Sequence, residues 1–198
     1  PLGYAVGNAL EVKEAIATLS GNGPEDLREL VLVLTSLMVV KAGKAKDIRE
    51  ARILLEETLD SGKALQVMKE WIVAQGGTAE EVEHPDLLPQ ALCQEAVCAE
   101  KSGFVTKIHT EEIGRICMLL GGGRAKKGDP IDLSVGLVLR KKVGDPVHSG
   151  ESLAILHAND REKLAEAKER LLKAYEIKKE PVAVRPLIWE ILDGTEAE

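Results

Sequence analysis

The sequence predicts a mixed α+β protein in which helices come first and strands follow. Up to about residue 77, apolar residues recur at helical spacing, and glycines and a proline interrupt the pattern. After residue 90, short runs alternate apolar and polar residues, which is typical of strands. Residues 78–90 are acidic and contain two prolines, which indicates a surface linker. We therefore predict a helical unit over residues 1–90 and an α+β unit over residues 91–198.

Four helices are predicted in the first unit, over residues 8–19, 24–40, 45–59 and 63–75. Asn8 is the predicted N-cap of the first helix, because Glu11 follows it at the spacing of a capping box. Pro24 suits the first turn of the second helix, and the acidic pair after it suits a helix N-terminus. Gly62 follows the third helix and is expected at the C′ position.

The apolar residues of the second and third helices predict their inward faces. The second helix has a wide apolar stripe, so we expect it to be well buried. The residues of this stripe are Leu27, Leu30, Val31, Leu34, Leu37 and Met38. The third helix is expected to turn five residues inward, namely Ile48, Ala51, Leu54, Leu55 and Leu59.

The second unit is expected to combine strands with two helices. Strands are predicted over residues 92–100, 104–110, 132–141, part of 143–158, 176–179 and 187–192, the last two as sheet edges. A helix is predicted over residues 110–120 with Thr110 as its N-cap. A charged amphipathic helix is predicted over residues 159–175, and its inward residues are Leu164, Ala167, Leu171 and Leu172.

Composition and charge exclude several classes of protein. Aromatic residues make up only 3% of the chain, which argues against a base-stacking platform for single-stranded nucleic acid. The net charge of −7 disfavours a general binder of nucleic acid or of anionic membranes. Cys93, Cys98 and Cys117 have no metal-binding spacing and suit reduced thiols. With no apolar run of membrane-spanning length, we expect a soluble, cytoplasmic chain.

The sequence contains no recognisable catalytic centre. The glycines at 121–123 precede Arg124, yet they follow a predicted helix, whereas a phosphate-binding loop precedes one. They are therefore interpreted as a capping turn. The four histidines are scattered, without the paired spacing of a metal site. Ser149 and Ser152 lie near His148, but no aspartate is placed to complete a triad.

The stretch "VGDPVHSGESLAILHA" at residues 143–158 resembles the turn and strand that close biotinyl/lipoyl-like sandwich domains. The stretch "SGFVTKI" at residues 102–108 resembles the strand that pairs with it. We therefore expect a barrel-sandwich core in the second unit. A carrier domain needs a lysine alone on a tight hairpin, and Arg140-Lys141-Lys142 does not offer one. A stand-alone sandwich-fold binding or carrier module without catalytic activity remains the alternative function.

Three longer stretches carry a more specific resemblance. They are "PLGYAVGNALEVKEAI" at 1–16, "MLLGGGRAKKGDPIDLSVGLVLRKKVGDPV" at 118–147 and "GESLAILHAND" at 150–160. Together they resemble the pyrimidine-nucleoside phosphorylases and thymidine phosphorylases, over essentially the whole chain. The resemblance implies that the chain is the C-terminal part of such an enzyme. Residues 1–90 would then belong to its central α/β domain and residues 91–198 to its C-terminal α+β domain.

The resemblance also implies a reaction, the reversible phosphorolysis of pyrimidine nucleosides to free base and (deoxy)ribose-1-phosphate. Phosphate is the co-substrate, no cofactor is required for the chemistry, and the parent enzyme is expected to be a homodimer. The family's phosphate-binding and base-binding segments have no counterpart in this sequence. We therefore assign no catalytic residue and expect this chain alone to be inactive. A relative of anthranilate phosphoribosyltransferase, which shares the core fold, would leave residues 100–178 unexplained.

One family feature falls inside the chain. Some bacterial members bind a structural monovalent cation, potassium, at the loop that matches residues 1–7. The resemblance implies that its ligands here are the backbone carbonyls of Leu2 and Ala5 and the carboxylate of Glu14. Oxygen atoms of this kind suit a hard cation. The alternative is that Glu14 is an ordinary surface residue of a helix. Because the other ligands are absent, we expect weak or no cation binding by this chain.

Overall fold

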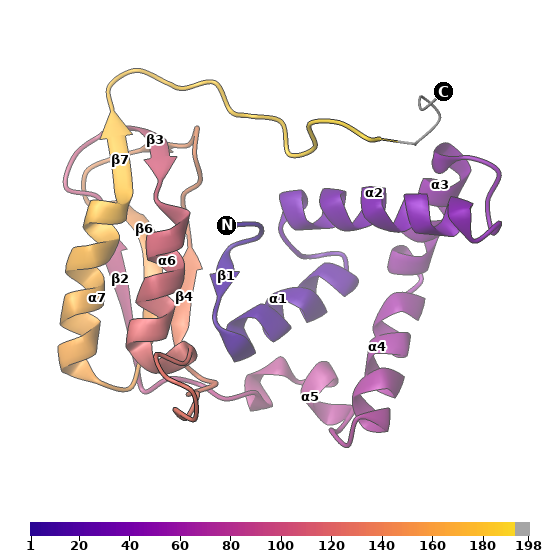
Figure 1. Cartoon of the computed structure of the whole chain (residues 1–198), viewed down its shortest axis with the longest axis horizontal. Helices are drawn as coiled ribbons and strands as arrows, with labels where there is room; N and C mark the ends of the chain where they lie inside the picture. The colour runs from indigo at the N-terminus through magenta and orange to yellow at the C-terminus, as the bar shows by residue number, and fades with distance from the viewer. Residues whose placement is uncertain (193–198) are drawn as a thin grey trace.

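The computed structural model describes residues 1–192, so the predicted end of the second unit at residues 193–198 lies outside the described residues. Within residues 1–192 the chain forms helices and two antiparallel sheets, which confirms the predicted mixed α+β class. Figure 1 shows the strands gathered with α6 and α7 on one side, and α1 to α5 on the other. We refer to residues 8–87 as the helical part and to residues 91–178 as the β part.

The helical part contains five helices and a short 3₁₀ turn. These elements are α1 (Asn8–Leu19), α2 (Glu25–Lys41), α3 (Ile48–Asp60), α4 (Lys63–Ala74), α5 (Glu80–Glu83) and the turn Pro85–Leu87. The four predicted helices are therefore present within a few residues of their expected bounds. The predicted linker over residues 78–90 is partly helical, because it contains α5 and the 3₁₀ turn.

Two predicted N-caps are displaced by one residue. Asn8 is the first residue of α1, and the N-cap is Gly7, whose N–H donates to Glu11 Oε1 at 3.0 Å. Thr110 is likewise the first residue of α6, after His109. The predicted C′ glycine is confirmed. Gly62 has a φ of +74° and its N–H donates to the Leu59 carbonyl at 3.0 Å, as expected where a left-handed residue ends a helix.

Two antiparallel sheets combine the strands of the β part with one strand from the start of the chain. The strands are β1 (Ala5–Val6), β2 (Cys93–Cys98), β3 (Gly103–Ile108), β4 (Gly136–Leu139), β5 (Pro146–Val147), β6 (Ser152–Ala158) and β7 (Tyr175–Lys178). One sheet has the order β1-β4-β6-β2 and the other the order β5-β3-β7. No closed barrel is seen among residues 1–192, so the expected barrel-sandwich core is not confirmed.

Two strand predictions were wrong in their extent or existence. The strand predicted over residues 132–141 is limited to β4, because Asp132 and Ser134 form a turn instead. The Asp132 carboxylate accepts from the Ser134 N–H at 3.0 Å and from its hydroxyl at 2.6 Å. The edge strand predicted over residues 187–192 is absent. The described chain after β7 runs without strand pairing along the top of the molecule in Figure 1.

The strand β1 joins the start of the chain to the β part. Ala5 pairs with Val138 and Val6 with Leu137, so β1 forms one edge of the four-stranded sheet. Two glycines permit this close approach. A Cβ on Gly136, at φ +149°, would lie 2.2 Å from the Val6 carbonyl oxygen, and a Cβ on Gly7 would lie 2.5 Å from the Val135 carbonyl oxygen. The first loop, residues 1–7, is thus fixed against β4.

The main hydrophobic core lies in the β part. Helices α6 (Thr110–Cys117) and α7 (Arg161–Ala174) pack on the four-stranded sheet, with Ile113 and Ile116 of α6 fully buried. The predicted inward residues of α7 are confirmed, since Leu164, Ala167 and Leu171 are buried and Leu172 packs beside them. The buried cluster extends from Ala91 to Ile177, and Val6 packs against it.

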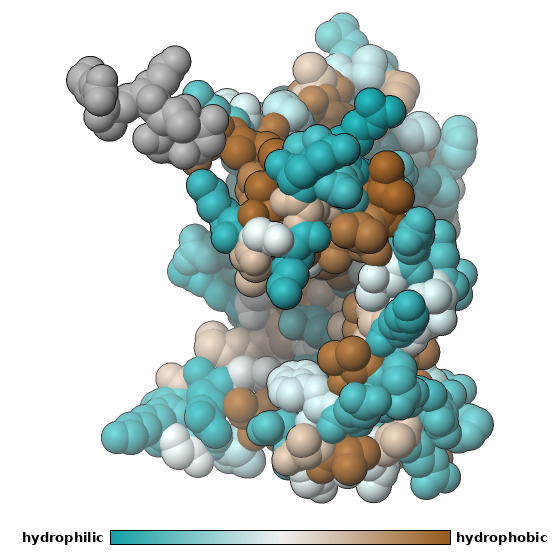
Figure 2. All heavy atoms as spheres, turned by 90° about the vertical axis from the view of Figure 1, so that its right-hand side faces the viewer, coloured by the Kyte–Doolittle hydropathy of each residue, from teal (hydrophilic) through white to brown (hydrophobic). Residues whose placement is uncertain are grey.

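The helical part is much less buried than its sequence predicts. In α2 only Leu32 and Ser36 are buried, so the expectation of a well-buried helix was wrong. In α3 only Ala51 and Leu59 are buried, while Ile48 and Leu54 are exposed. The exposed large apolar residues of the three helices α2 to α4 are Val31, Leu34, Met38, Ile48, Ile53, Leu54, Val67, Trp71 and Val73. Figure 2 shows apolar side chains gathered on this side of the molecule.

Candidate functional site

The first loop, which contains the predicted site residues Leu2 and Ala5, is held by side chains of other elements. The Glu14 carboxylate, on α1, accepts hydrogen bonds from the N–H groups of Tyr4 at 2.8 Å and Ala5 at 3.0 Å, both through Oε1. Its other oxygen lies against Gly3, where an added Cβ would be 2.1 Å from Oε2. The side chain of Glu14 therefore points toward the first loop, and its carboxylate contacts the backbone of the segment that contains the other two predicted cation ligands.

The three predicted ligand residues are brought together in one cavity. Leu2, Ala5 and Glu14 all line a cavity of about 460 Å³ between the first loop, α1 and the start of α6. Thr110 and Ile113 of α6 also line it. Backbone carbonyls and a carboxylate are the kinds of oxygen donor that a hard monovalent cation takes, so the residue types at this cavity are compatible with the prediction. Side chains alone do not make a metal site, since no group of three or more His, Cys, Asp or Glu among residues 1–192 could hold a metal ion.

A second set of contacts, from Lys142 and Asp26, also holds the loop. Lys142, between β4 and β5, places its Nζ 2.7 Å from Asp26 Oδ2 and 2.7 Å from the Pro1 carbonyl oxygen. The same Nζ lies 5.1 Å from the centre of the Tyr4 ring, within the range of a cation–π contact. Asp26 also accepts the Gly3 N–H at 3.2 Å. We call Lys142, Asp26, Tyr4 and the Pro1 carbonyl the Lys142 cluster.

The charge of Asp26 is stabilised within this cluster. Partial burial alone would raise the pKa of the Asp26 carboxyl, but the hydrogen bond and charge of Lys142 act against it. The N–H groups of Leu27 and Gly3 add to the effect of Lys142, and the pKa lies below its ordinary value. Asp26 therefore remains an anion at neutral pH and keeps its pairing with Lys142.

Sequence reasoning missed the Lys142 cluster. Asp26 was interpreted only as an acidic residue in a first helical turn, and Lys142 only as a poor candidate for a carrier lysine. The two residues are 116 positions apart, and no local pattern relates them. The structure supports the judgement on the carrier, because Lys141 and Lys142 have side chains only 16% and 22% exposed and both are ion-paired.

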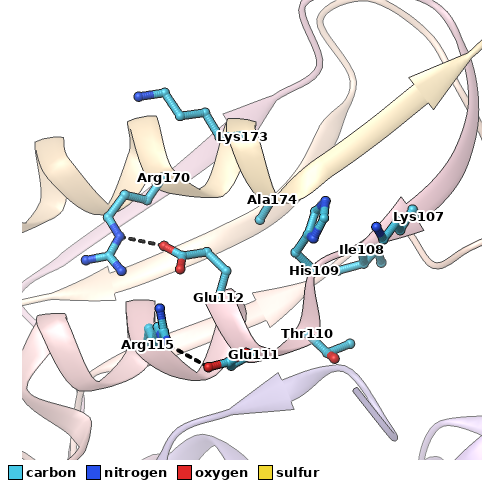
Figure 3. Close-up of a pocket in the computed structure, with 10 residues that line it drawn as sticks. All are labelled: Lys107, Ile108, His109, Thr110, Glu111, Glu112, Arg115, Arg170, Lys173 and Ala174. Atoms are coloured by element: carbon cyan, nitrogen blue, oxygen red, sulfur yellow. Dashed lines mark hydrogen bonds and ion pairs between the residues drawn. The ribbon is translucent and has the colours of Figure 1, made fainter.

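A larger cavity of about 650 Å³ lies between the end of β3 and the helices α6 and α7. Figure 3 shows the cationic side chains of Lys107, Arg115, Arg170 and Lys173 around it. Most of this charge is already neutralised. Arg170 pairs with Glu112 at 2.6 Å, Arg115 with Glu111 at 2.5 Å, and Lys107 with Glu176 at 3.5 Å. The cavity is therefore best explained as an ion-paired surface between the two helices and β3.

The remaining motifs have structural roles. The helix α6 continues into a wider turn, Met118–Gly122, in which Gly121 has a φ of +110°. This geometry supports the interpretation of the glycines as a turn that ends the helix. His157 is half-buried on β6, and burial, with the charges of Lys13 and Arg140, lowers its pKa. Among residues 1–192 no helix is both long and apolar enough to cross a membrane.

Comparison with known proteins shows similarity to one family model and to two curated proteins of the same name. Residues 104–178 match the family model described as the pyrimidine nucleoside phosphorylase C-terminal domain. The chain is 50% identical over 190 residues to a pyrimidine-nucleoside phosphorylase of Geobacillus stearothermophilus, which covers 96% of this chain and 44% of that protein. It is 57% identical over 159 residues to the pyrimidine-nucleoside phosphorylase of Bacillus subtilis (strain 168), covering 80% of this chain and 37% of that protein. The chain thus spans less than half the length of these curated relatives.

Proposed function

We propose, from the premise that this chain belongs to the pyrimidine-nucleoside phosphorylase family, that it is the scaffold portion of an enzyme for pyrimidine nucleosides. The enzyme would catalyse reversible phosphorolysis to free base and (deoxy)ribose-1-phosphate, with phosphate as co-substrate. It would act in the cytoplasm as a homodimer. The observation that carries the proposal is the 50% identity to the Geobacillus relative across 96% of the chain.

The proposed division of labour agrees with the chemistry of the described residues. Phosphorolysis requires groups that position phosphate and stabilise charge on the departing base. In the cavities of the described chain, cationic side chains such as Arg170 and Lys142 are already ion-paired, with Glu112 and Asp26 respectively. They are therefore not free to position phosphate or to stabilise the departing base. We therefore propose that the reacting groups are supplied by polypeptide that this chain does not match, and that this chain alone is inactive.

The exposed face of α2, α3 and α4 is the proposed contact with that polypeptide. No residue of α4 is buried, and Trp71 on this helix is 62% exposed. Burying a large apolar side chain contributes about 1.5–3 kcal/mol, so nine such residues could stabilise a large interface. An apolar face of this extent is unusual for a surface that remains in water.

The first loop is proposed to hold a structural monovalent cation. Leu2 and Ala5 would contribute their carbonyl oxygens, and Glu14 the carboxylate oxygen that makes no hydrogen bond to the Tyr4 and Ala5 amides. When bound, such a cation would neutralise the carboxylate and stabilise the turn of the loop. The chain's own contribution is to hold these three residues around one cavity.

Reconstitution tests the proposed enzyme function. The chain is mixed with the remaining part of the Geobacillus stearothermophilus relative, outside the stretch that it matches. Uridine or thymidine is added with phosphate, and release of the base is followed by its absorbance. We expect neither piece to be active alone and the mixture to release base in a phosphate-dependent manner. Turnover by this chain alone, or an inactive complex of the two pieces, would contradict the proposal.

A pair of matched variants tests the contact face. Trp71→Asp places a charge on the exposed face of α4, whereas Leu92→Asp places one on the β part at a residue that is 86% exposed. We expect Trp71→Asp to prevent reconstitution and Leu92→Asp to permit it. Equal activity of the two variants would show that the helical face is not the contact surface.

A further inference from the structure

The Lys142 cluster connects three segments that are distant in sequence. Lys142 lies between β4 and β5, Asp26 lies in the first turn of α2, and Pro1 and Tyr4 belong to the first loop. The ammonium group contacts Asp26, the Pro1 carbonyl and the Tyr4 ring at once. The side chains of Lys142 and Asp26 are only 22% and 33% exposed, so their charged groups are partly shielded from water.

The position of Lys142 is itself fixed by its own turn. Its N–H donates to Asp145 Oδ2 at 2.7 Å, and the Asp145 N–H donates to the Lys142 carbonyl at 3.1 Å. The turn is joined to Val105 of β3 by two hydrogen bonds, because the Gly144 N–H donates to the Val105 carbonyl and the Val105 N–H donates to the Asp145 carbonyl. Lys142 therefore extends from a rigid turn of the β part toward a loop that has little regular structure.

The first loop depends on contacts of this kind. Beyond the two-residue strand β1, its backbone is held by the Tyr4 carbonyl, which accepts from Leu139 at 2.8 Å, and by side chains of other elements. Glu14 accepts hydrogen bonds from the Tyr4 and Ala5 amides, and Asp26 accepts one from the Gly3 amide. Without the Lys142–Asp26 pair, residues 1–3 lose both the ammonium contact and a correctly placed carboxylate.

We propose that Lys142 and Asp26 are positioning residues whose ion pair holds residues 1–5 where Leu2, Ala5 and Glu14 line one cavity. Neither residue is a ligand. Their role is to keep the backbone of the loop in the orientation that a bound cation would require. The cation part of this inference depends on the proposed function of the loop, whereas the ordering of the loop does not.

Hydrogen exchange of individual backbone amides tests the ordering of the loop. The probes are the amides of Gly3, Tyr4 and Ala5, and the reference is the buried Ala99, whose amide donates to the Glu151 carbonyl at 2.8 Å. We expect Lys142→Met and Asp26→Asn to accelerate exchange of the three loop amides by roughly tenfold. Ala99 should be unchanged, and Lys142→Arg should restore most of the protection because it keeps the charge.

A matched control separates this effect from the loss of any ion pair. Lys168→Met removes the Lys168–Glu95 pair, which lies wholly within the β part, and should leave the loop amides unaffected. Loop amides of Lys142→Met that exchange within twofold of wild type would overturn the proposal. If Lys142→Met does not fold, Asp26→Asn carries the test with the same criterion. Loss of Ala99 protection in both variants would also overturn it, because the pair would then support the whole fold.

Potassium chloride, titrated against choline chloride at constant ionic strength, tests the cation part. Because this chain alone is expected to bind the cation weakly or not at all, the titration uses its complex with the remaining part of the Geobacillus stearothermophilus relative. In that complex we expect potassium to slow exchange at Tyr4 and Ala5 of the wild type, with a midpoint about tenfold higher in Lys142→Met. Equal potassium midpoints in the wild type and in Lys142→Met would show that Lys142 does not position the residues that bind the cation. If the wild type does not respond to potassium while Lys142→Met still exchanges faster, the cation proposal is wrong and the ordering role is supported.

Discussion

Replacing Leu156 by alanine tests whether the stability of the molecule resides in the β part. Leu156 lies in β6, is fully buried, and pairs across the sheet with Leu137, which is also fully buried. Removing three carbons at about 0.8 kcal/mol each costs about 2.4 kcal/mol, and the cavity left behind adds to this. We expect Leu156→Ala to lower the free energy of unfolding by about 3–4 kcal/mol.

Leu34→Ala in α2 is the matched control. Leu34 is 52% exposed, so the same truncation removes about half as much buried surface. Alanine also has the higher helix propensity, and the expected loss is therefore about 1 kcal/mol or less. Urea unfolding followed by far-ultraviolet circular dichroism measures both variants, and exchange of the Ala99 amide reports on the β part separately. If Leu34→Ala costs as much as Leu156→Ala, the conclusion that the main core lies between Ala91 and Ile177 is wrong.

Three further predictions concern the first loop, acid stability and thiol reactivity. Gly136→Ala should lower the free energy of unfolding by about 2–4 kcal/mol, because its Cβ would meet the Val6 carbonyl oxygen. The control is Gly43→Ala, at φ +67° with open space around it, which should cost about 1 kcal/mol. Equal urea midpoints for Gly136→Ala and Gly43→Ala would refute the steric argument. His157 has a folded-state pKa below its unfolded value, so the unfolded state binds its proton first as the pH falls. The wild type should therefore lose stability relative to His157→Gln between pH 7 and pH 5, and parallel stability curves would contradict this. Cys117 is buried and its pKa is raised to about 11 by burial, whereas Cys98 is exposed. A disulfide reagent at pH 8 should modify Cys98 rapidly in the native protein and Cys117 only after unfolding, and a fast phase that persists in Cys98→Ala would oppose this assignment.

Local patterns predicted the elements well, because they depend on residues that are close in sequence. The spacing of Leu164, Ala167 and Leu171 identified the inward face of α7, and Gly62 marked the end of α3. The same kind of pattern failed for α2. Its apolar stripe showed which face is apolar, but burial requires other elements to cover that face, and α3 covers it only in part, so that Val31, Leu34 and Met38 remain exposed.

Long-range features required the structure. The alternation in residues 187–192 suggested a strand, yet a strand needs a partner, and the described residues provide none. The Lys142–Asp26 contact joins residues that no spacing rule relates. For the candidate site, the family resemblance indicated Leu2, Ala5 and Glu14, and the structure places all three at one cavity. Their role as cation ligands stays a prediction.

The pairing of β1 with β4 affects when the first loop can form during synthesis. Ala5 leaves the ribosome well before its partner Val138, which follows 133 residues later. At about 5–20 residues per second, roughly 7–27 seconds of translation separate the two. During this interval β1 has no partner strand to pair with. The helices between Ala5 and Val138 depend mainly on local contacts and can form as they emerge. The first loop therefore reaches its native position only after β4 has been synthesised.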